Sequence, residues 1–212
     1  MKNLTVSIAI LLAYLLVNAG LAVSAPDPRT CPQAIGKAID AADSESFTRL
    51  VDLDSIVDEG VTLFLAEMRK PEVARDLPPM LAMMFSRAAT EDDMGKSIRT
   101  MLVGETRAFI LNGVSSGAFA GRNPTGAAQQ GMLAPLFADA SRGRKEIRSI
   151  GQARAIGDAL WHVPFVVHDG GNGLDYPIVG LVGLADGKLR LVAIDNLAEL
   201  FAKIAAESRA NQ

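Results

Sequence analysis

A serine flanked by glycines is the first candidate for covalent chemistry in this sequence. Residues 113–117, Gly-Val-Ser-Ser-Gly, match the pattern G-x-S-x-G, in which a serine on a sharp turn from a buried strand into a helix acts as a nucleophile. His162 and His168 follow in the chain and could supply a base. A helical pattern precedes Ser115, however, and a segment rich in glycine, asparagine and proline follows it. We therefore expect Ser115 to lie in a loop, without a catalytic role.

A second motif, residues 170–175 (Gly-Gly-Asn-Gly-Leu-Asp), matches a calcium-binding repeat. In that architecture the ion is shared between stacked copies and needs six or more oxygen ligands. The sequence has a single copy, which lies between two apolar segments. Glycine and asparagine tolerate positive φ, so the motif predicts a hairpin turn rather than a metal site.

The two histidines give no metal site either. If both lie in one strand, the six residue steps from His162 to His168 separate them by about 20 Å. A metal ion needs both ring nitrogens at about 2 Å. Five methionines between residues 80 and 101 have the spacing of helical core positions, where methionine fills irregular space. We expect neither a metal nor another cofactor.

Four residues are the candidates for lining a ligand pocket, namely Asp158, Trp161, His162 and Asp175. Trp161 and His162 belong to a predicted strand that is apolar on both faces. Carboxylates buried beside aromatic rings would have a raised pKa, which would favour a small-molecule carrier or an isomerase-like enzyme. Exposed carboxylates would favour a domain that works by binding alone.

The elements that must position these residues fall into two groups. Helices are expected first, over the range 32–111, where apolar residues recur at steps of three and four. The clearest is a single helix over 47–68 that ends before Pro71, and a later helix starts at a capping box formed by Thr90 and Asp93. Residues 112–140 are expected to form a loop and a short helix around 129–138.

Strands follow the helices, in a β-meander over 145–195. The pattern predicts strands at 146–150, 155–168, 176–185 and 188–194, joined by hairpin turns at 169–173 and at 186–187. A closing helix is expected over 196–208. Helices followed by an antiparallel meander define an α+β domain.

Two of these strands have an unusual composition, because both of their faces are apolar. In strand 155–168, Trp161, Val163 and Phe165 alternate with His162 and neighbours such as Val166, and the segment from Tyr176 to Leu184 is apolar on both faces as well. One layer of helices covers only one side of a sheet. The second side is therefore expected to meet a second subunit, an envelope partner, the additional helices or an apolar ligand.

The N-terminus has the features of a secretory signal peptide. Lys2 precedes an uncharged run from Asn3 to Ala25, and Val23-Ser24-Ala25 offers the small residues that signal peptidase recognises. Residues 1–25 are thus expected to be removed, with cleavage after Ala25 or, because Pro26 disfavours that site, after Ala22. The remaining domain, residues 26–212, is expected to be periplasmic or secreted, without a membrane span.

Charge and cysteine content exclude several classes of protein. The formal net charge of −3 argues against binding to nucleic acid, whose phosphates require a basic surface. Cys31 is the single cysteine, so no disulfide can form within the chain. The residues before it, Pro28-Arg29-Thr30, do not form a lipoprotein signal. The fold must therefore be stabilised by its core.

N-terminal helices that pack on a curved antiparallel meander resemble the nuclear-transport-factor-two-like, or cystatin-like, superfamily. Secreted bacterial members have a stretch that is similar to residues 43–54, Asp-Ser-Glu-Ser-Phe-Thr-Arg-Leu-Val-Asp-Leu-Asp. The resemblance covers residues 33–70 and 145–195 and implies a cone-shaped fold. Members of this superfamily are enzymes, carriers or interaction modules, so the resemblance does not select a function.

Together these observations predict an exported, non-enzymatic α+β domain that works by binding. Its expected partner is a second copy or an envelope protein on the open face of the sheet. The alternative is a carrier or isomerase-like enzyme with an apolar pocket between helices and sheet.

Overall fold

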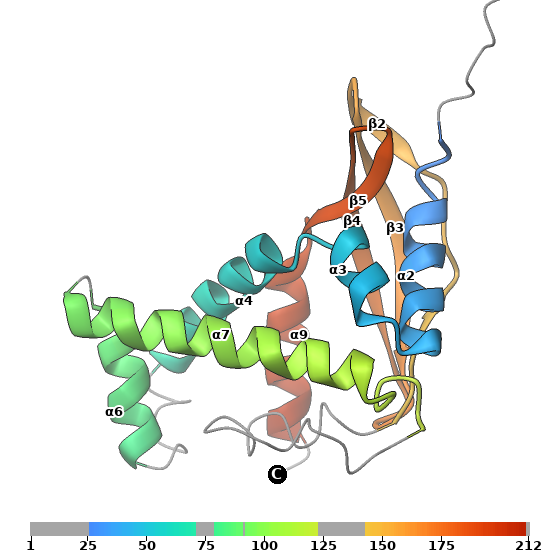
Figure 1. Ribbon diagram of the computed structural model, residues 1–212. Coiled ribbons are helices and arrows are strands. Elements are labelled where there is room, and N and C mark those ends of the chain that lie inside the picture. The colour runs from blue at the N-terminus through green and yellow to red at the C-terminus, as the bar shows by residue number, and fades with distance from the viewer. Residues whose placement is uncertain (1–25, 71–78, 91, 123–142, 211–212) are drawn as a thin grey trace, which may run out of the picture.

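The computed structural model describes residues 26–70, 79–90, 92–122 and 143–210 (Figure 1). In this part of the chain, six helices and a five-stranded antiparallel sheet confirm the expected α+β class. The expected short helix around 129–138 lies outside the described residues. The elements are α2 (Thr30–Ala41), α3 (Ser44–Leu50), α4 (Leu53–Met68), α6 (Pro79–Ala88), α7 (Asp93–Ser115), β1 (Lys145–Arg148), β2 (Arg154–Gly157), β3 (Leu160–Asp169), β4 (Leu174–Ala185), β5 (Lys188–Ile194) and α9 (Leu197–Ala210).

The sheet has the strand order β1-β3-β4-β5, and β2 pairs with β3 on the same side as β1. Both expected hairpins are present. The turn after Asp169 joins β3 to β4 in a register that starts at Asp169↔Leu174, and the turn at Asp186-Gly187 joins β4 to β5. Positive φ at Asp186, Gly187 and Gly173 shows why these turns require residues that tolerate the left-handed region.

The strand expected over 155–168 is two strands, because the chain reverses at residues 158–159. β2 folds back on β3 and pairs with it from Arg154↔His162 to Gly157↔Leu160. Every residue of β2 is exposed, so this edge strand leaves no burial signal of its own in the sequence. The apolar alternation predicted for the second part is correct: Val163 and Phe165 are buried, and Pro164 between them is exposed.

The single helix expected over 47–68 is wrong, because it is broken between α3 and α4. Val51 has an extended backbone and forms a parallel bridge with Leu191 of β5. The amide of Asp52 donates a hydrogen bond of 2.7 Å to the Leu191 carbonyl. Val51 is buried, as are Phe47 before the break and Leu53 after it, so the apolar periodicity continues across the break and conceals it.

The N-cap of α7 is Asp92 and not the expected Thr90. Asp92 Oδ1 accepts a hydrogen bond of 2.7 Å from the Gly95 amide, and the Thr90 hydroxyl donates to the same oxygen at 2.8 Å. A Cβ on Gly95 would lie 2.2 Å from the Thr90 carbonyl oxygen, so this close turn requires glycine. The helix also continues past the expected end at Asn112-Gly113, to Ser115.

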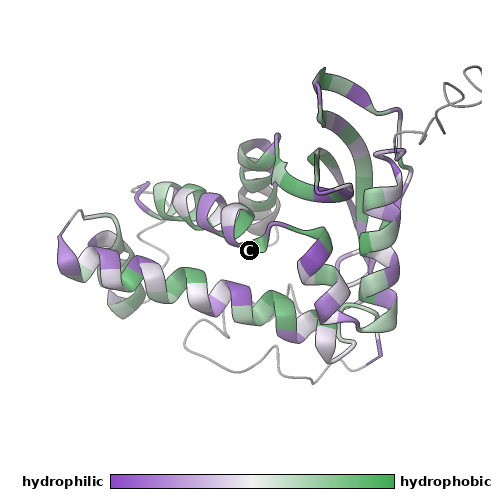
Figure 2. Cartoon of the chain, turned by 45° about the horizontal axis from the view of Figure 1, so that its top comes forward, coloured by the Kyte–Doolittle hydropathy of each residue, from purple (hydrophilic) through white to green (hydrophobic). Residues whose placement is uncertain are grey.

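Helices α2, α3, α4 and α9 pack against one face of the sheet. Val163 and Val182 belong to a core with α2, α3, α4 and α7, whereas Phe165 and Ile178 pack with Leu197 and other residues of α9. Apolar and polar residues interleave along helices and strands, as expected for elements with one buried face (Figure 2). α4 and α7 run side by side away from the sheet (Figure 1). No helix within the described ranges is long and apolar enough to cross a membrane.

Cys31 lies in the first turn of α2 and is 1% exposed. Burial raises the pKa of its thiol to about 11, although a backbone hydrogen bond at Leu191 acts in the opposite direction. The sulfur lies 4.0 Å from the Leu50 carbonyl oxygen. The thiol is therefore protonated at neutral pH and packed in the core.

Neighbouring valines in β3 allow a test of which face of the sheet is buried. Val167 is half-buried and packs against the cluster that includes α9, whereas Val166 points to the opposite face. We expect Val167→Lys to lower the free energy of unfolding by about 2 kcal/mol or more. The substitution removes an apolar side chain from its packing against α9 and places a charge without a partner there. Val166→Lys should change it by less than about 1 kcal/mol. Urea denaturation measures both, and equal effects would contradict the assignment of the faces.

Candidate functional site

An apolar cavity lies among three helices, α4, α7 and α9. Its volume is about 350 Å³. Its described lining is apolar except for the hydroxyl of Thr106, and no carboxylate, imidazole, amine or thiol contributes to it. The lining residues are Ile56, Val57, Gly60, Val61, Phe64, Leu102, Thr106, Ile110, Phe201 and Ile204.

The sequence forms this cavity by placing a glycine where two helices meet. Gly60 lies inside α4, and a Cβ at this position would lie 3.9 Å from the Phe201 ring of α9, which is an ordinary contact distance. The missing side chain therefore leaves room between α4 and α9. Ile204, one turn further along α9, is 49% exposed, so one wall of the cavity lies at the protein surface.

Two ion pairs on the surface align α4 and α7 as antiparallel neighbours beside the cavity. Arg107 Nε lies 2.8 Å from Asp54 Oδ1, and Arg99 Nη2 lies 3.1 Å from Asp58 Oδ1. Their side chains are partly exposed, so each contributes little to stability. These two ion pairs instead fix the register between α4 and α7. In this register Leu102 and its neighbours lie opposite Val57.

A second hollow, of about 360 Å³, lies near the start of α7 and has a polar lining. It contains three cations, Arg69, Lys96 and Arg99. Arg99 is already held by the carboxylate of Asp58 and by the hydroxyl of Thr62. Because the Arg99 guanidinium already has these partners, this hollow is a weaker candidate for a ligand site than the apolar cavity.

The predicted pocket residues do not converge on one site. Trp161 and His162 are neighbours in β3, so their side chains point to opposite faces of the sheet. Trp161 packs, half-buried, against the core on the helix side. His162 lies on the other face, with Nε2 at 3.6 Å from Asp195 Oδ2.

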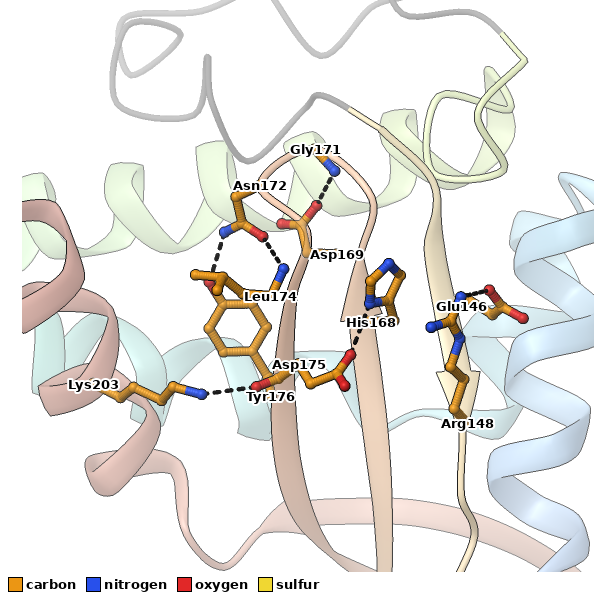
Figure 3. A network of polar contacts seen from close by, with 10 residues as sticks. All are labelled: Glu146, Arg148, His168, Asp169, Gly171, Asn172, Leu174, Asp175, Tyr176 and Lys203. Carbon is orange, nitrogen blue, oxygen red and sulfur yellow. Dashed lines mark hydrogen bonds and ion pairs between the residues drawn. The ribbon is translucent and has the colours of Figure 1, made fainter. Parts of the chain in front are cut away.

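Both predicted carboxylates are exposed. Asp158 lies in the turn between β2 and β3, at the opposite end of β3 from Asp175. The side chain of Asp175 is 62% exposed, and its Oδ1 lies 2.7 Å from His168 Nδ1 (Figure 3). Neither carboxylate is buried beside an aromatic ring, which was the condition for acid–base chemistry. None of the four candidates lines the cavity.

The glycine-rich segment before Asp175 uses its polar groups within the turn itself (Figure 3). Asp169 Oδ1 accepts a hydrogen bond of 2.7 Å from the Gly171 amide and pairs with Lys145 Nζ. Asn172 accepts from the Leu174 amide at 3.0 Å and donates to the Tyr176 hydroxyl at 2.7 Å. These hydrogen bonds stabilise a hairpin turn between β3 and β4, as expected for this segment. Among the described residues, no group of three or more His, Cys, Asp or Glu side chains could hold a metal ion.

Ser115 is the last residue of α7, and its hydroxyl lies 3.5 Å from the Asn112 carbonyl oxygen. The nucleophile motif requires a strand before the serine and a sharp turn at it. Ser115 instead ends a 23-residue helix, so it does not lie in the expected loop, and the geometry of a nucleophile elbow is absent at this position.

Sequence reasoning missed the residues that line the cavity. Those on α4 and α7 have the spacing of a helical core stripe, which is the same whether the stripe packs tightly or borders a hollow. Gly60 was the available signal, because glycine inside a helix costs about 1 kcal/mol relative to alanine and requires a reason.

Comparisons of the chain with protein-family models, with curated proteins and with solved structures gave no match. The resemblance to the nuclear-transport-factor-two-like superfamily therefore stays a prediction.

Two of the helical glycines, Gly60 and Gly104, test whether the cavity has room beside α4. A Cβ on Gly104 would have nothing within 4 Å, so Gly104→Ala should raise the free energy of unfolding by about 0.5–1 kcal/mol through helix propensity alone. We expect Gly60→Ala to stabilise the protein at least as much, since its methyl group also contacts Phe201. Thermal and urea denaturation measure the two effects. A loss of stability in Gly60→Ala would show that the space is too small.

Proposed function

We propose that this chain is an exported, non-enzymatic binding protein whose ligand is a small apolar molecule held among α4, α7 and α9. The observation that supports this function is the apolar cavity of about 350 Å³, which has one wall at the protein surface. Known small-molecule sites occupy about 300–1,000 Å³ and are mainly apolar, and an apolar cavity of about 150 Å³ suffices for benzene. A molecule of two or three rings, or a short chain, matches the space.

The lining favours binding over catalysis. Acid–base and nucleophilic mechanisms need a titratable or nucleophilic side chain within hydrogen-bonding reach of the substrate. The described lining offers hydrocarbon side chains and one hydroxyl. Transfer of a ligand CH₂ group from water into such a site contributes about 0.8 kcal/mol, so apolar area alone supports useful affinity.

A leucine at position 60 should block this site. The side chain of Gly60→Leu would extend into the space beside Phe201 and occupy it. We expect the wild type to bind N-phenyl-1-naphthylamine, a neutral fluorescent probe, with an increase in its emission. Gly60→Leu should bind it at least about 10-fold more weakly, the equivalent of about two lost methylene contacts.

Gly104→Leu is the matched control, because it makes the same chemical change at an exposed position of α7. It should bind the probe like the wild type. No emission change with the wild type, or equal binding by all three proteins, would contradict the proposed ligand site. Circular dichroism establishes that each variant is folded.

A second candidate function, self-association through the open face of the sheet, is favoured by the charges on that face. Leu160, Val166, Val179 and Leu181 point to this face, are half-buried, and belong to neither of the two clusters that pack against helices. Arg154 pairs in register with His162, so it lies on the same face, near the β1/β2 edge. Asp195 directly follows β5, at the other edge of the sheet, and its side chain is 57% exposed.

A second copy related by a two-fold axis parallel to the strands would complement this arrangement. The β1/β2 edge of one sheet would then lie over the β5 edge of the other. Arg154 of each copy would approach Asp195 of the other, so the same ion pair would occur twice, as an isologous interface requires. Apolar side chains would fill the centre, where Pro164 and Pro177 are exposed.

Charge reversal tests this association. Arg154→Glu and Asp195→Arg should each weaken a dimer about 10-fold or more, because each places like charges opposite one another. The double variant should restore it. Sedimentation equilibrium of the mature chain measures the effect. A wild type that stays monomeric at high concentration, or a dimer unaffected by both reversals, would contradict self-association by this face.

A further inference from the structure

The hydroxyl of Thr106 has no hydrogen-bond partner among the described residues, although three other helical threonines use theirs. Thr48, Thr62 and Thr100 each donate a hydrogen bond to the carbonyl oxygen four residues earlier, at 2.8, 2.8 and 3.0 Å. This bond is common for threonine inside a helix. The side-chain hydroxyl of Thr106 makes no hydrogen bond with any described residue, and Thr106 lines the cavity.

An unused hydroxyl in an apolar wall specifies the chemistry of the ligand. It can donate one hydrogen bond and accept others, so it complements a hydroxyl or a carbonyl group. A ligand with an ionised group would bury that charge without a partner, since no charged side chain lines the described cavity. The nearest cation along the chain, Arg107, is directed to Asp54 at 2.8 Å.

We infer that the ligand is a neutral, mainly apolar molecule with one oxygen, of a hydroxyl or a carbonyl, that forms a hydrogen bond with Thr106 Oγ1. This inference rests on the proposed function and adds to it the class of ligand. A pure hydrocarbon would leave the hydroxyl unpaired, and a molecule with several polar groups would leave its other groups unpaired. Thr106 is thus expected to set specificity, while the apolar wall supplies most of the affinity.

A pair of matched probes separates the two contributions. Naphthalene and 2-naphthol differ by one hydroxyl, and both are neutral at pH 7. Each is measured by displacement of N-phenyl-1-naphthylamine from the wild type, from Thr106→Val and from Thr100→Val. Valine keeps the shape of threonine and removes the hydroxyl. Thr100→Val is the control, because Thr100 is on the same helix but does not line the cavity.

We expect the preference for 2-naphthol over naphthalene to fall about 3- to 10-fold in Thr106→Val, the effect of one hydrogen bond on a binding constant. The affinity for naphthalene should stay within about 2-fold, and Thr100→Val should match the wild type. An unchanged preference in Thr106→Val, with both probes still bound, would overturn this inference and leave the proposed function intact. Failure of the wild type to bind either probe would overturn the proposed function as well.

Discussion

The contact between Val51-Asp52 and the edge of β5 determines how the helical part of this protein is attached to its sheet. The amide of Asp52 donates to the carbonyl of Leu191, and the Arg190 guanidinium donates to the carbonyl of Val51 at 3.2 Å. These bonds occupy backbone groups that a continuous helix would need for itself. The chain therefore ends α3, crosses the sheet edge and starts α4 in a new direction.

The position of the cavity follows from that change of direction. Because α4 starts at the sheet edge and leads away from it, α7 packs along α4 with only its C-terminal part near the sheet (Figure 1). α9 returns from the end of β5 and contacts both α4 and β4. α4 and α7 lie side by side, whereas α9 crosses them at a steep angle (Figure 1), and Gly60 lies where α4 faces Phe201 of α9. A straight helix over 47–68 would not produce this junction.

Local signals in the sequence were sufficient for most of the fold. The turns at 169–173 and at Asp186-Gly187 have their own chemistry, so the hairpins could be predicted from a few residues each. The break at Val51 could not, because its cause is a partner 140 residues later in the chain. The turn at Asp158-Ala159 was missed because β2 is exposed throughout and shows no alternation. The cavity was missed because an apolar stripe does not reveal whether its neighbours fill the space.

The buried thiol of Cys31 has a consequence for how this chain behaves outside a reducing compartment. Thiolates, and not thiols, attack disulfides, and the interior position of Cys31 suppresses both ionisation and access. Folding itself thereby removes the one group through which two chains could become covalently linked. Oxidation of this thiol and mixed-disulfide formation are confined to molecules that have not yet folded, so the speed of folding after synthesis also sets how uniform the thiol chemistry of the product is.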